Sequence, residues 1–259
     1  MEKEKPDQLV QSLDRALNII EELVETDKTI GVTELSNMLG IHKSTVHRLL
    51  ATLLYRGYVE RDQNGRYKVG LKLFEIGGRA LNKMDLRNKI KPYLIKLQKE
   101  TGETIHLGIL QGNEIVYIDK EETTETIRMY SEVGRRIDAY CTSLGKVLLA
   151  YGDINVRDFF AGQELKNYTP NTIIDKNLLQ KHLDTVKEKG FAIDNQEQEM
   201  GIRCIGGPIF NYDGKVIAAF SIAGPTTRMT MERVNQLSGL IKKYSCLISS
   251  SFGYIVVET

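Results

Sequence analysis

The sequence lacks any long apolar run. Its apolar stretches are short and interrupted by polar residues, and no apolar segment follows the charged start Met1–Lys5. A membrane-spanning helix needs about 20 consecutive apolar residues, and a signal peptide needs an apolar core behind its charged start. We therefore expect a soluble, cytoplasmic protein without a membrane partner.

Cysteines are too few and too scattered for a disulfide framework or a zinc ribbon. There are three, Cys141, Cys204 and Cys246, and no two of them have CxxC spacing. A cysteine nucleophile would need a histidine partner, and only His106 lies in an expected strand of the second half of the chain. His106, Cys141 and Cys204 also lack the spacing of a zinc motif. We expect no catalytic residue, no metal and no cofactor.

A phosphate loop is also missing. The pair Gly145-Lys146 looks like the end of such a loop. However, Tyr140 stands where the loop needs its first glycine, and Val147 replaces the required Ser or Thr. This segment therefore does not predict a nucleoside triphosphate site.

Residues 29–69 do show a strong pattern, that of two paired helices followed by a β-hairpin. Thr33–Leu39 is a short helical run opened by a cap-type residue, and Gly40-Ile41 is typical of the turn between paired helices. In the next helix an apolar stripe recurs at i, i+3, i+4 and i+7, formed by Val46, Leu49, Leu50 and Leu53. The N-terminal end and the remaining faces carry Lys43, Ser44, Thr45, His47 and Arg48. We expect this helix to enter the major groove of duplex DNA.

After this helix the spacing at which apolar residues recur changes from 3.6 residues, typical of a helix, to two residues, typical of a strand. Tyr58–Asp62 and Arg66–Val69 alternate as strands around Asn64-Gly65, a strong hairpin signal. This hairpin would offer Arg61, Arg66 and Lys68 to the phosphate backbone. Residues 28–72 hold eight Lys or Arg against three Asp or Glu, a net charge of +5, while the whole chain carries +1. The charge supports a DNA reader, although paired helices also serve as protein-interaction or dimerisation modules.

The length of 259 residues predicts more than one domain. We expect a DNA-binding domain over residues 1–70, in which Leu9–Val24 adds a first helix. A linker helix would follow over residues 71–84, and a second domain over residues 85–259. The segment Leu71–Leu81 has so many large apolar residues that we expect it to pack against a second copy of the chain.

The second domain shows a mixture of helices and antiparallel strands. Helices are expected over Leu86–Glu100, Ser143–Ala150, Asp175–Lys189 and Thr230–Phe252. Strands are expected over Thr104–Leu110, Glu114–Ile118, Thr126–Tyr130, Phe191–Asp194, Cys204–Asn211 and Lys215–Ala223. This order is typical of an α+β domain with an antiparallel sheet.

One helix start in this domain suits an anion. A helix that begins at Ser143, with Ser143 as its expected cap, presents unpaired N–H groups and the positive end of its dipole, which favour a carboxylate or a phosphate. Met129, Asp194, Cys204 and Ser221 lie in segments expected to converge on the same sheet. Each of these four residues also fits an ordinary core position, so the residues alone leave both interpretations open.

Ordered motifs in both halves carry a resemblance to a known family. They are the segments Lys43–Leu50, Gly57–Val59, Leu71–Gly77, Ser143–Ala150 and Glu199–Ile205. Through them almost the whole chain resembles the IclR family of bacterial transcription regulators. The resemblance implies a winged helix-turn-helix, a linker helix and a GAF-like effector domain, assembled as a homodimer or a dimer of dimers.

Further segments narrow the resemblance within the family. Glu103–Gly108, Arg128–Ser131, Gly134–Arg136 and Asp194–Glu199 are most similar to regulators of pectin-degradation and 2-keto-3-deoxygluconate genes. The resemblance implies that the helix start at Ser143, Leu144 and Gly145 holds the carboxylate of an effector. It further implies that Asp194, Cys204 and Ser221 meet the polar end of the effector and that Met129 forms a wall.

Further residues bear on the identity of the effector. Ala223 stands where some members that bind small 2-oxo acids have a second serine, which leaves more room here. Arg135 and Arg136 are either a second anion contact or a solvated edge. Both positions affect which ligand would fit.

We expect a repressor that binds double-stranded operator DNA and is released by a small, carboxylate-bearing sugar metabolite such as 2-keto-3-deoxygluconate. Two alternatives stay open. One is an activator of the same family that responds to another oxo acid or an aromatic acid, and the other is a ligand-processing enzyme fused to a DNA-binding domain.

Overall fold

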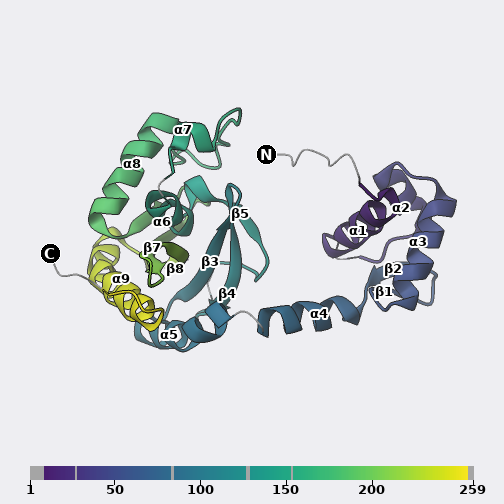
Figure 1. Cartoon of the computed structure of the whole chain (residues 1–259), viewed down its shortest axis with the longest axis horizontal. Coiled ribbons are helices and arrows are strands. Elements are labelled where there is room, and N and C mark those ends of the chain that lie inside the picture. The colour runs from purple at the N-terminus through teal and green to yellow at the C-terminus, as the bar shows by residue number, and fades with distance from the viewer. Residues whose placement is uncertain (1–8, 27, 83–84, 127–128, 153, 256–259) are drawn as a thin grey trace. The chain divides into compact units, whose positions relative to one another are not determined.

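The computed structural model describes residues 9–26, 28–82, 85–126, 129–152 and 154–255. The chain divides into two compact units, with the boundary between residues 84 and 85. Figure 1 shows the elements of each unit. Among the described helices, none has both the length and the apolar character that crossing a bilayer requires.

The N-terminal unit is a small helical core closed by a hairpin. Its elements are α1 (Gln11–Val24), α2 (Val32–Leu39), α3 (Lys43–Tyr55), β1 (Val59–Arg61), β2 (Tyr67–Val69) and α4 (Leu71–Asn82). The core is built by Ile19, Leu23, Ile30, Leu35, Val46, Leu50, Leu53, Val59 and Tyr67. Three members of the predicted α3 stripe, Val46, Leu50 and Leu53, are thus buried as their spacing requires.

The start of α2 differs from the expectation. The N-cap is Gly31, whose N–H donates to Glu34 Oε2 at 2.8 Å, so Thr33 lies inside the helix rather than at its cap. Gly40 ends α2 with a φ of 64°, a left-handed conformation that glycine adopts without steric cost. This glycine produces the tight turn into α3.

The C-terminal unit is built on an antiparallel sheet in the order β5-β4-β3-β8-β7-β6. Its strands are β3 (Thr104–Gln111), β4 (Glu114–Glu121), β5 (Arg136–Asp138), β6 (Ala192–Asn195), β7 (Ile202–Phe210) and β8 (Val216–Pro225). Its helical segments are α5 (Asp85–Thr101), η1 (Ala139–Cys141), α6 (Ser143–Tyr151), α7 (Val156–Phe159), α8 (Lys176–Lys189) and α9 (Met231–Ser251). The α+β class with an antiparallel sheet is confirmed.

One predicted strand is wrong. Thr126, Met129 and Tyr130 are not in a strand, and Ile127 and Arg128 lie outside the described residues. The strand beside β4 is instead β5, which pairs Ile137 with Ile115. Alternation of side chains over a few residues occurs in loops as well as in strands, so it did not distinguish the two.

The two faces of the sheet carry different helices. Neighbouring strand residues point to opposite faces. A Cβ at Gly206 would meet Ser143 of α6, whereas a Cβ at Gly207 would meet Ile241 of α9. Helix α6 therefore covers the face shared by Gly206, and α9 covers the other face (Figure 1).

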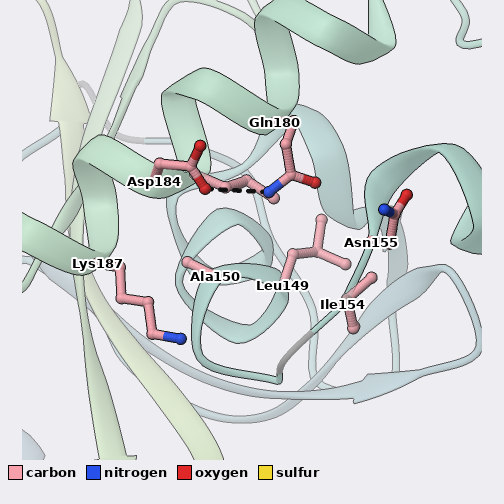
Figure 2. A pocket seen from close by; sticks show the side chains of 8 residues that line it. Leu149, Ala150, Ile154, Asn155, Gln180, Asp184 and Lys187 are labelled. Carbon is pink, nitrogen blue, oxygen red and sulfur yellow. Dashed lines mark hydrogen bonds between the residues drawn. The ribbon is translucent and has the colours of Figure 1, made fainter.

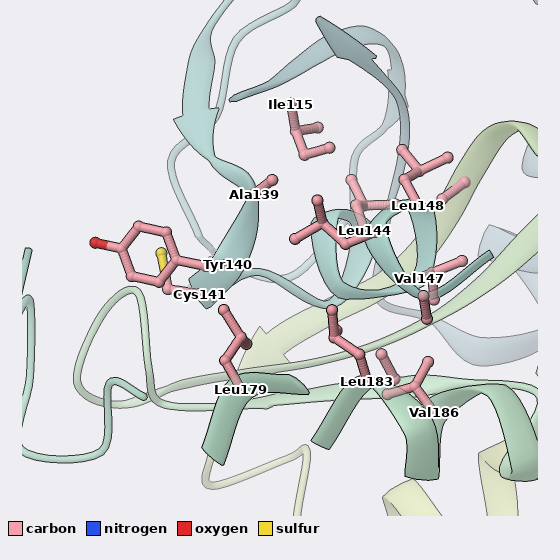
Figure 3. Close-up of a cluster of buried hydrophobic side chains, with 14 of the residues drawn as sticks. Ile115, Ala139, Tyr140, Cys141, Leu144, Val147, Leu148, Leu179, Leu183 and Val186 are labelled. Atoms are coloured by element: carbon pink, nitrogen blue, oxygen red, sulfur yellow. The ribbon is translucent and has the colours of Figure 1, made fainter. Parts of the chain in front are cut away.

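A large apolar cluster fixes α6 between the sheet and α8. Leu144 and Leu148 of α6 pack with Ile115 of β4, and Leu179 and Leu183 of α8 complete the contact (Figure 3). All of α6 from Ser143 to Ala150 is buried. The position of the start of α6 over the sheet is consequently set by packing on both sides.

Candidate DNA interface and effector pocket

Helix α3 presents its polar residues to solvent. Lys43, Ser44, His47 and Arg48 are exposed, and Thr45 is half-buried. The opposite side of α3 is held in the core by the apolar stripe. All five predicted reading residues therefore lie at the N-terminal half of a firmly packed helix, as a recognition helix requires.

The hairpin of β1 and β2, residues 59–69, is the wing of this unit. Arg66 attaches it to the rest of the unit. Its guanidinium donates to the carbonyl oxygen of Thr29, at 2.6 Å from Nη2, and pairs with Glu34 at 2.7 Å. Tyr67 adds an antiparallel bridge to Ile30. Arg66 therefore sets the position of the wing, in addition to the phosphate contact expected from its sequence.

The other two basic wing residues are more exposed. Lys68 forms an ion pair with Glu60 at 3.1 Å, and the guanidinium of Arg61 lies over the ring of Tyr67, 5.7 Å from its centroid. Asp62 shapes the tip by accepting the N–H groups of Asn64 and Arg66. The wing thus presents Arg61 and Lys68 beside a short, defined turn.

A row of pocket candidates crosses four strands on the face that α6 covers. Register pairs Asp194 of β6 with Cys204 of β7, Cys204 with Ala223 of β8, and Ala223 with Thr104 of β3. Register partners in an antiparallel sheet share a face. Met129 packs against Cys204 and Ala223. The structure therefore brings Asp194, Cys204 and Met129 together.

The next row on this face brings Ser221 below α6. Ser221 pairs with Gly206 of β7 and with His106 of β3. A Cβ at Gly206 would lie 3.2 Å from Ser143 Oγ, so Ser143 stands directly over this part of the sheet. Ser143 and Ser221 therefore line one small region of the buried face.

The cap of α6 differs from the prediction. Thr142, not Ser143, is the N-cap, and Thr142 Oγ1 accepts the N–H of Gly145 at 3.1 Å. Gly145 is also pressed against η1, where any Cβ would overlap Ala139. Among the described residues, the amides of Ser143 and Leu144 have no hydrogen-bond partner. These two amides are the groups of the first turn that remain for a carboxylate.

Asp194 is a buried acid whose pKa is raised. Burial raises the pKa of Asp194 from 3.8 to about 7. Its Oδ1 accepts the N–H of Glu197 at 2.7 Å, and Glu197 in turn forms an ion pair with the fully buried Lys146. Lys146 also donates to the carbonyl oxygen of Ile193 at 3.1 Å. At neutral pH Asp194 can therefore donate as well as accept a hydrogen bond.

Three further buried residues belong to this side of the sheet, and the sequence did not single them out as effector contacts. His106 stacks on Tyr117, with ring centroids 4.7 Å apart, and its Nε2 lies 2.7 Å from Ser131 Oγ. All three side chains are buried. The available signal was the period of two, which puts His106 on the same face as Thr104, but the pairing with Ser221 is not visible in local sequence.

The two adjacent arginines differ in their surroundings. Arg136 pairs with Glu114 at 2.7 Å and donates to Gln111 Oε1, which keeps it at the exposed edge of the sheet. Arg135 donates to the carbonyl oxygen of Tyr130 at 3.3 Å. The solvated-edge interpretation fits Arg136, whose guanidinium is already occupied.

A separate hollow lies between α6 and α8 and contains none of these residues. It is lined by Leu149, Ile154, Asn155, Gln180, Asp184 and Lys187, among others (Figure 2). Gln180 donates to Asp184, one turn further along α8, at 3.1 Å. The lining of this hollow shares no residue with the row of Asp194, Cys204 and Ser221.

Comparison with known proteins decides the class of the molecule. Residues 12–63 match the IclR helix-turn-helix domain, and residues 78–250 match the C-terminal domain of bacterial IclR transcriptional regulators. The chain belongs to the IclR family. It is accordingly a DNA-binding transcriptional regulator and not an enzyme, so the alternative of a ligand-processing enzyme is set aside.

Relatives in the IclR family match along nearly the whole chain. The transcriptional regulator KdgR of Escherichia coli K12 is 41% identical over 95% of this chain and 94% of its own length. The regulator XynR of the same organism is 36% identical over 95% of this chain and 98% of its own. The crystal structure of the Thermotoga maritima IclR protein is 34% identical, with a TM-score of 0.80, over 95% of this chain and 100% of that chain.

Proposed function

We propose that this IclR-family regulator is a repressor whose operator affinity falls when a small carboxylate-bearing sugar metabolite, such as 2-keto-3-deoxygluconate, binds the C-terminal unit. The observation that carries the proposal is the polar row beneath the start of α6. The amides of Ser143 and Leu144, which have no partner in the described part of the chain, suit a carboxylate. Asp194, Cys204 and Ser221 on the same face offer polar groups to the rest of such a molecule.

The chemistry of Asp194 supports an acidic ligand. A second negative charge in a buried site would be unfavourable beside an ionised carboxylate. Because the pKa of Asp194 is raised to about 7, this side chain is about half protonated at neutral pH, and the protonated form can donate to a ligand oxygen. The pocket therefore accepts one carboxylate without placing two like charges together.

The DNA-reading residues are proposed from their positions on α3 and on the hairpin, where most of them are exposed. Ser44 and Arg48, with Lys43, Thr45 and His47, would contact the major groove, while Arg61, Arg66 and Lys68 would contact phosphates. The exposed side of α3 and the fixed wing support this assignment.

A homodimer, or a dimer of dimers, is supported by apolar residues that the described single chain leaves exposed. Leu13, Leu17 and Val24 lie on one side of α1, and Leu71 and Phe74 project from α4. Large exposed apolar side chains grouped in this way mark protein–protein contacts. A two-fold dimer would also carry two copies of α3, as a palindromic operator requires.

The test is reciprocal linkage between operator and effector. A duplex selected from a random library by the full-length protein serves as the operator, and its affinity is measured by fluorescence anisotropy with and without 2-keto-3-deoxygluconate. We expect the metabolite to weaken operator binding about 5- to 150-fold, and operator to weaken metabolite binding by the same factor. Equal affinities in both titrations would contradict allosteric control, and tighter operator binding would contradict release by the metabolite.

A further inference from the structure

The side chain of Tyr117 is largely buried on the face of the sheet that α6 covers, and its hydroxyl group has no partner among the described residues. Tyr117 pairs with Gly108, and a Cβ at Gly108 would meet Leu144 of α6, so both residues face α6. Only 5% of Tyr117 is exposed. Within the part of the chain that the structure describes, its hydroxyl makes no hydrogen bond. The hydroxyl oxygen is not among the fully enclosed polar atoms that lack a partner, so it faces a small opening in which a polar group of a bound molecule would complete its hydrogen bonding.

The surroundings of Tyr117 connect it with the predicted pocket. Burial raises the pKa of Tyr117, and the proximity of Cys204 and Asp194 raises it further. The phenol therefore stays protonated and neutral as it approaches the row of Asp194 and Cys204. It remains a hydrogen-bond donor at every pH at which the protein functions.

His106 holds the ring of Tyr117 in place. The two rings are stacked with an interplanar angle of 24°. Ser131 fixes His106 at 2.7 Å, and the carbonyl oxygen of Ser131 accepts from Lys120 of β4. Burial lowers the pKa of His106 to about 4, so the imidazole is neutral and its stacking does not depend on pH near neutrality. Strands β3 and β4 and the segment with Met129 are thereby joined around one side of the pocket.

We propose that Tyr117 determines effector specificity by donating a hydrogen bond to a hydroxyl group on the carbon chain of the effector, with His106 as its positioning residue. This inference rests on the proposed function. A carboxylate held by the amides of Ser143 and Leu144 leaves the phenol of Tyr117 without a partner. The ligand must therefore carry a second polar group in addition to its carboxylate. A hydroxylated oxo acid fits this requirement, and an unsubstituted one leaves the phenol unpaired.

The experiment compares two six-carbon 2-oxo acids by calorimetric titration of the full-length protein. 2-Keto-3-deoxygluconate carries hydroxyl groups, and 2-oxohexanoate does not. We expect the parent protein to prefer 2-keto-3-deoxygluconate. Tyr117→Phe should weaken binding of 2-keto-3-deoxygluconate by about tenfold or more and change the affinity for 2-oxohexanoate by less than about twofold. The matched control is Tyr244→Phe, which removes the hydroxyl that donates to Glu100.

The outcomes distinguish the proposed effector class from the proposed role of Tyr117. A parent protein that binds operator but neither acid contradicts the proposed effector class, and this inference with it. A parent that selects the hydroxylated acid while Tyr117→Phe keeps the full selectivity contradicts only the role of Tyr117. Equal weakening of both acids in Tyr117→Phe would reduce Tyr117 to a packing residue and overturn the proposal.

The role of His106 is tested by a pair of variants. His106→Phe keeps an aromatic ring against Tyr117 and should retain most of the selectivity between the two acids. His106→Ala removes the ring and should narrow the selectivity while operator binding without effector stays unchanged. Equal selectivity in both variants would contradict positioning by stacking.

Discussion

Arg66 donates to the carbonyl oxygen of Thr29 from both Nε and Nη2, at 3.0 and 2.6 Å. This pair joins the wing to the segment that precedes α2, and Glu34 of α2 binds the same guanidinium at 2.7 Å. The wing is therefore fixed before DNA binds, so its ordering does not reduce the affinity.

Arg66→Ala should weaken binding to all DNA sequences without changing the preference among them. The variant loses the anchor of the wing and one positive charge near the phosphates. The slope of log affinity against log salt concentration should therefore decrease in magnitude by about one. The measurement is the affinity for a selected and a random duplex between low and moderate salt. Glu34→Gln, which keeps the bond from Arg66 to Thr29, is the control. A loss confined to the selected duplex would contradict this role.

Arg48→Ala should reduce discrimination between operator and random DNA. The side chain is exposed on α3, where a lost base contact costs about 1–3 kcal/mol. Competition binding with both duplexes measures the ratio of affinities. Arg56→Ala is a matched control, because Arg56 is an exposed arginine just beyond the C-terminal end of the same helix. Unchanged discrimination in Arg48→Ala would move the reading face elsewhere on α3.

Asp194→Asn should make the C-terminal unit more stable than the parent at high pH. In the folded state the pKa of Asp194 is about 7, above the ordinary 3.8. Between these values the folded protein binds more protons than the unfolded chain, so Asp194 lowers the parent's stability as pH rises from about 4 to 7. The free energy of unfolding of the variant should exceed that of the parent by a few kcal/mol above pH 7, and the difference should vanish below pH 4. Denaturant unfolding of both proteins from pH 4 to 8 checks this, and a constant difference would contradict it.

The same substitution should alter effector binding. Protonated Asp194 donates to the ligand, so the parent's affinity should fall as pH rises through about 7. Asp194→Asn cannot titrate and should show a flatter profile, while Asp194→Ala should abolish the effector response and leave operator binding intact. An unchanged response in Asp194→Ala would remove this residue from the pocket.

Lys146→Met should strongly destabilise the protein. Lys146 is fully buried and pairs with Glu197, so the substitution leaves a buried carboxylate without its cation, a change that typically costs about 3–5 kcal/mol. Urea unfolding measures the loss. The double variant Lys146→Met with Glu197→Gln should recover part of it, because no unpaired charge remains. A double variant less stable than Lys146→Met would contradict this explanation.

Phe74→Gln should weaken self-association. Phe74 of α4 is 78% exposed in the single chain, and its apolar neighbours Leu71 and Ile76 are exposed as well. Sedimentation velocity at micromolar concentration should show the parent as a dimer or larger and the variant shifted toward the monomer. Tyr212→Gln, at a residue 75% exposed in the other unit, is the control. A monomeric parent would contradict the proposed assembly.

Features that depend on neighbouring residues were predictable from the sequence. The stripe of Val46, Leu50 and Leu53 and the Asn64-Gly65 turn each fix a local conformation, and the structure has α3 and the hairpin in these places. The start of α6 was predicted within one residue, but Thr142 and Ser143 are both good cap residues. Which of them caps depends on the packing of Gly145 against Ala139.

The remaining pocket residues were hidden because they meet through the pairing of distant strands. Ser221 lies opposite His106 only because β8 inserts beside β3, and more than 100 residues separate the two in sequence. Period two assigns a residue to a face but does not tell which strand lies beside it. Tyr117 was harder still to place, since a register shift follows Leu107 where β3 pairs with β4.

Gly206 affects the size of the proposed pocket but offers no chemical group to a ligand. A Cβ there would lie 3.2 Å from both the carbonyl carbon and Oγ of Ser143, tighter than most real contacts, so Gly206→Ala would lift the first turn of α6 without removing any polar group. The height of the pocket above the sheet is then governed by a residue that offers no side chain to a ligand. Ligand dimensions and ligand functional groups can thus vary independently, through different positions of one fold.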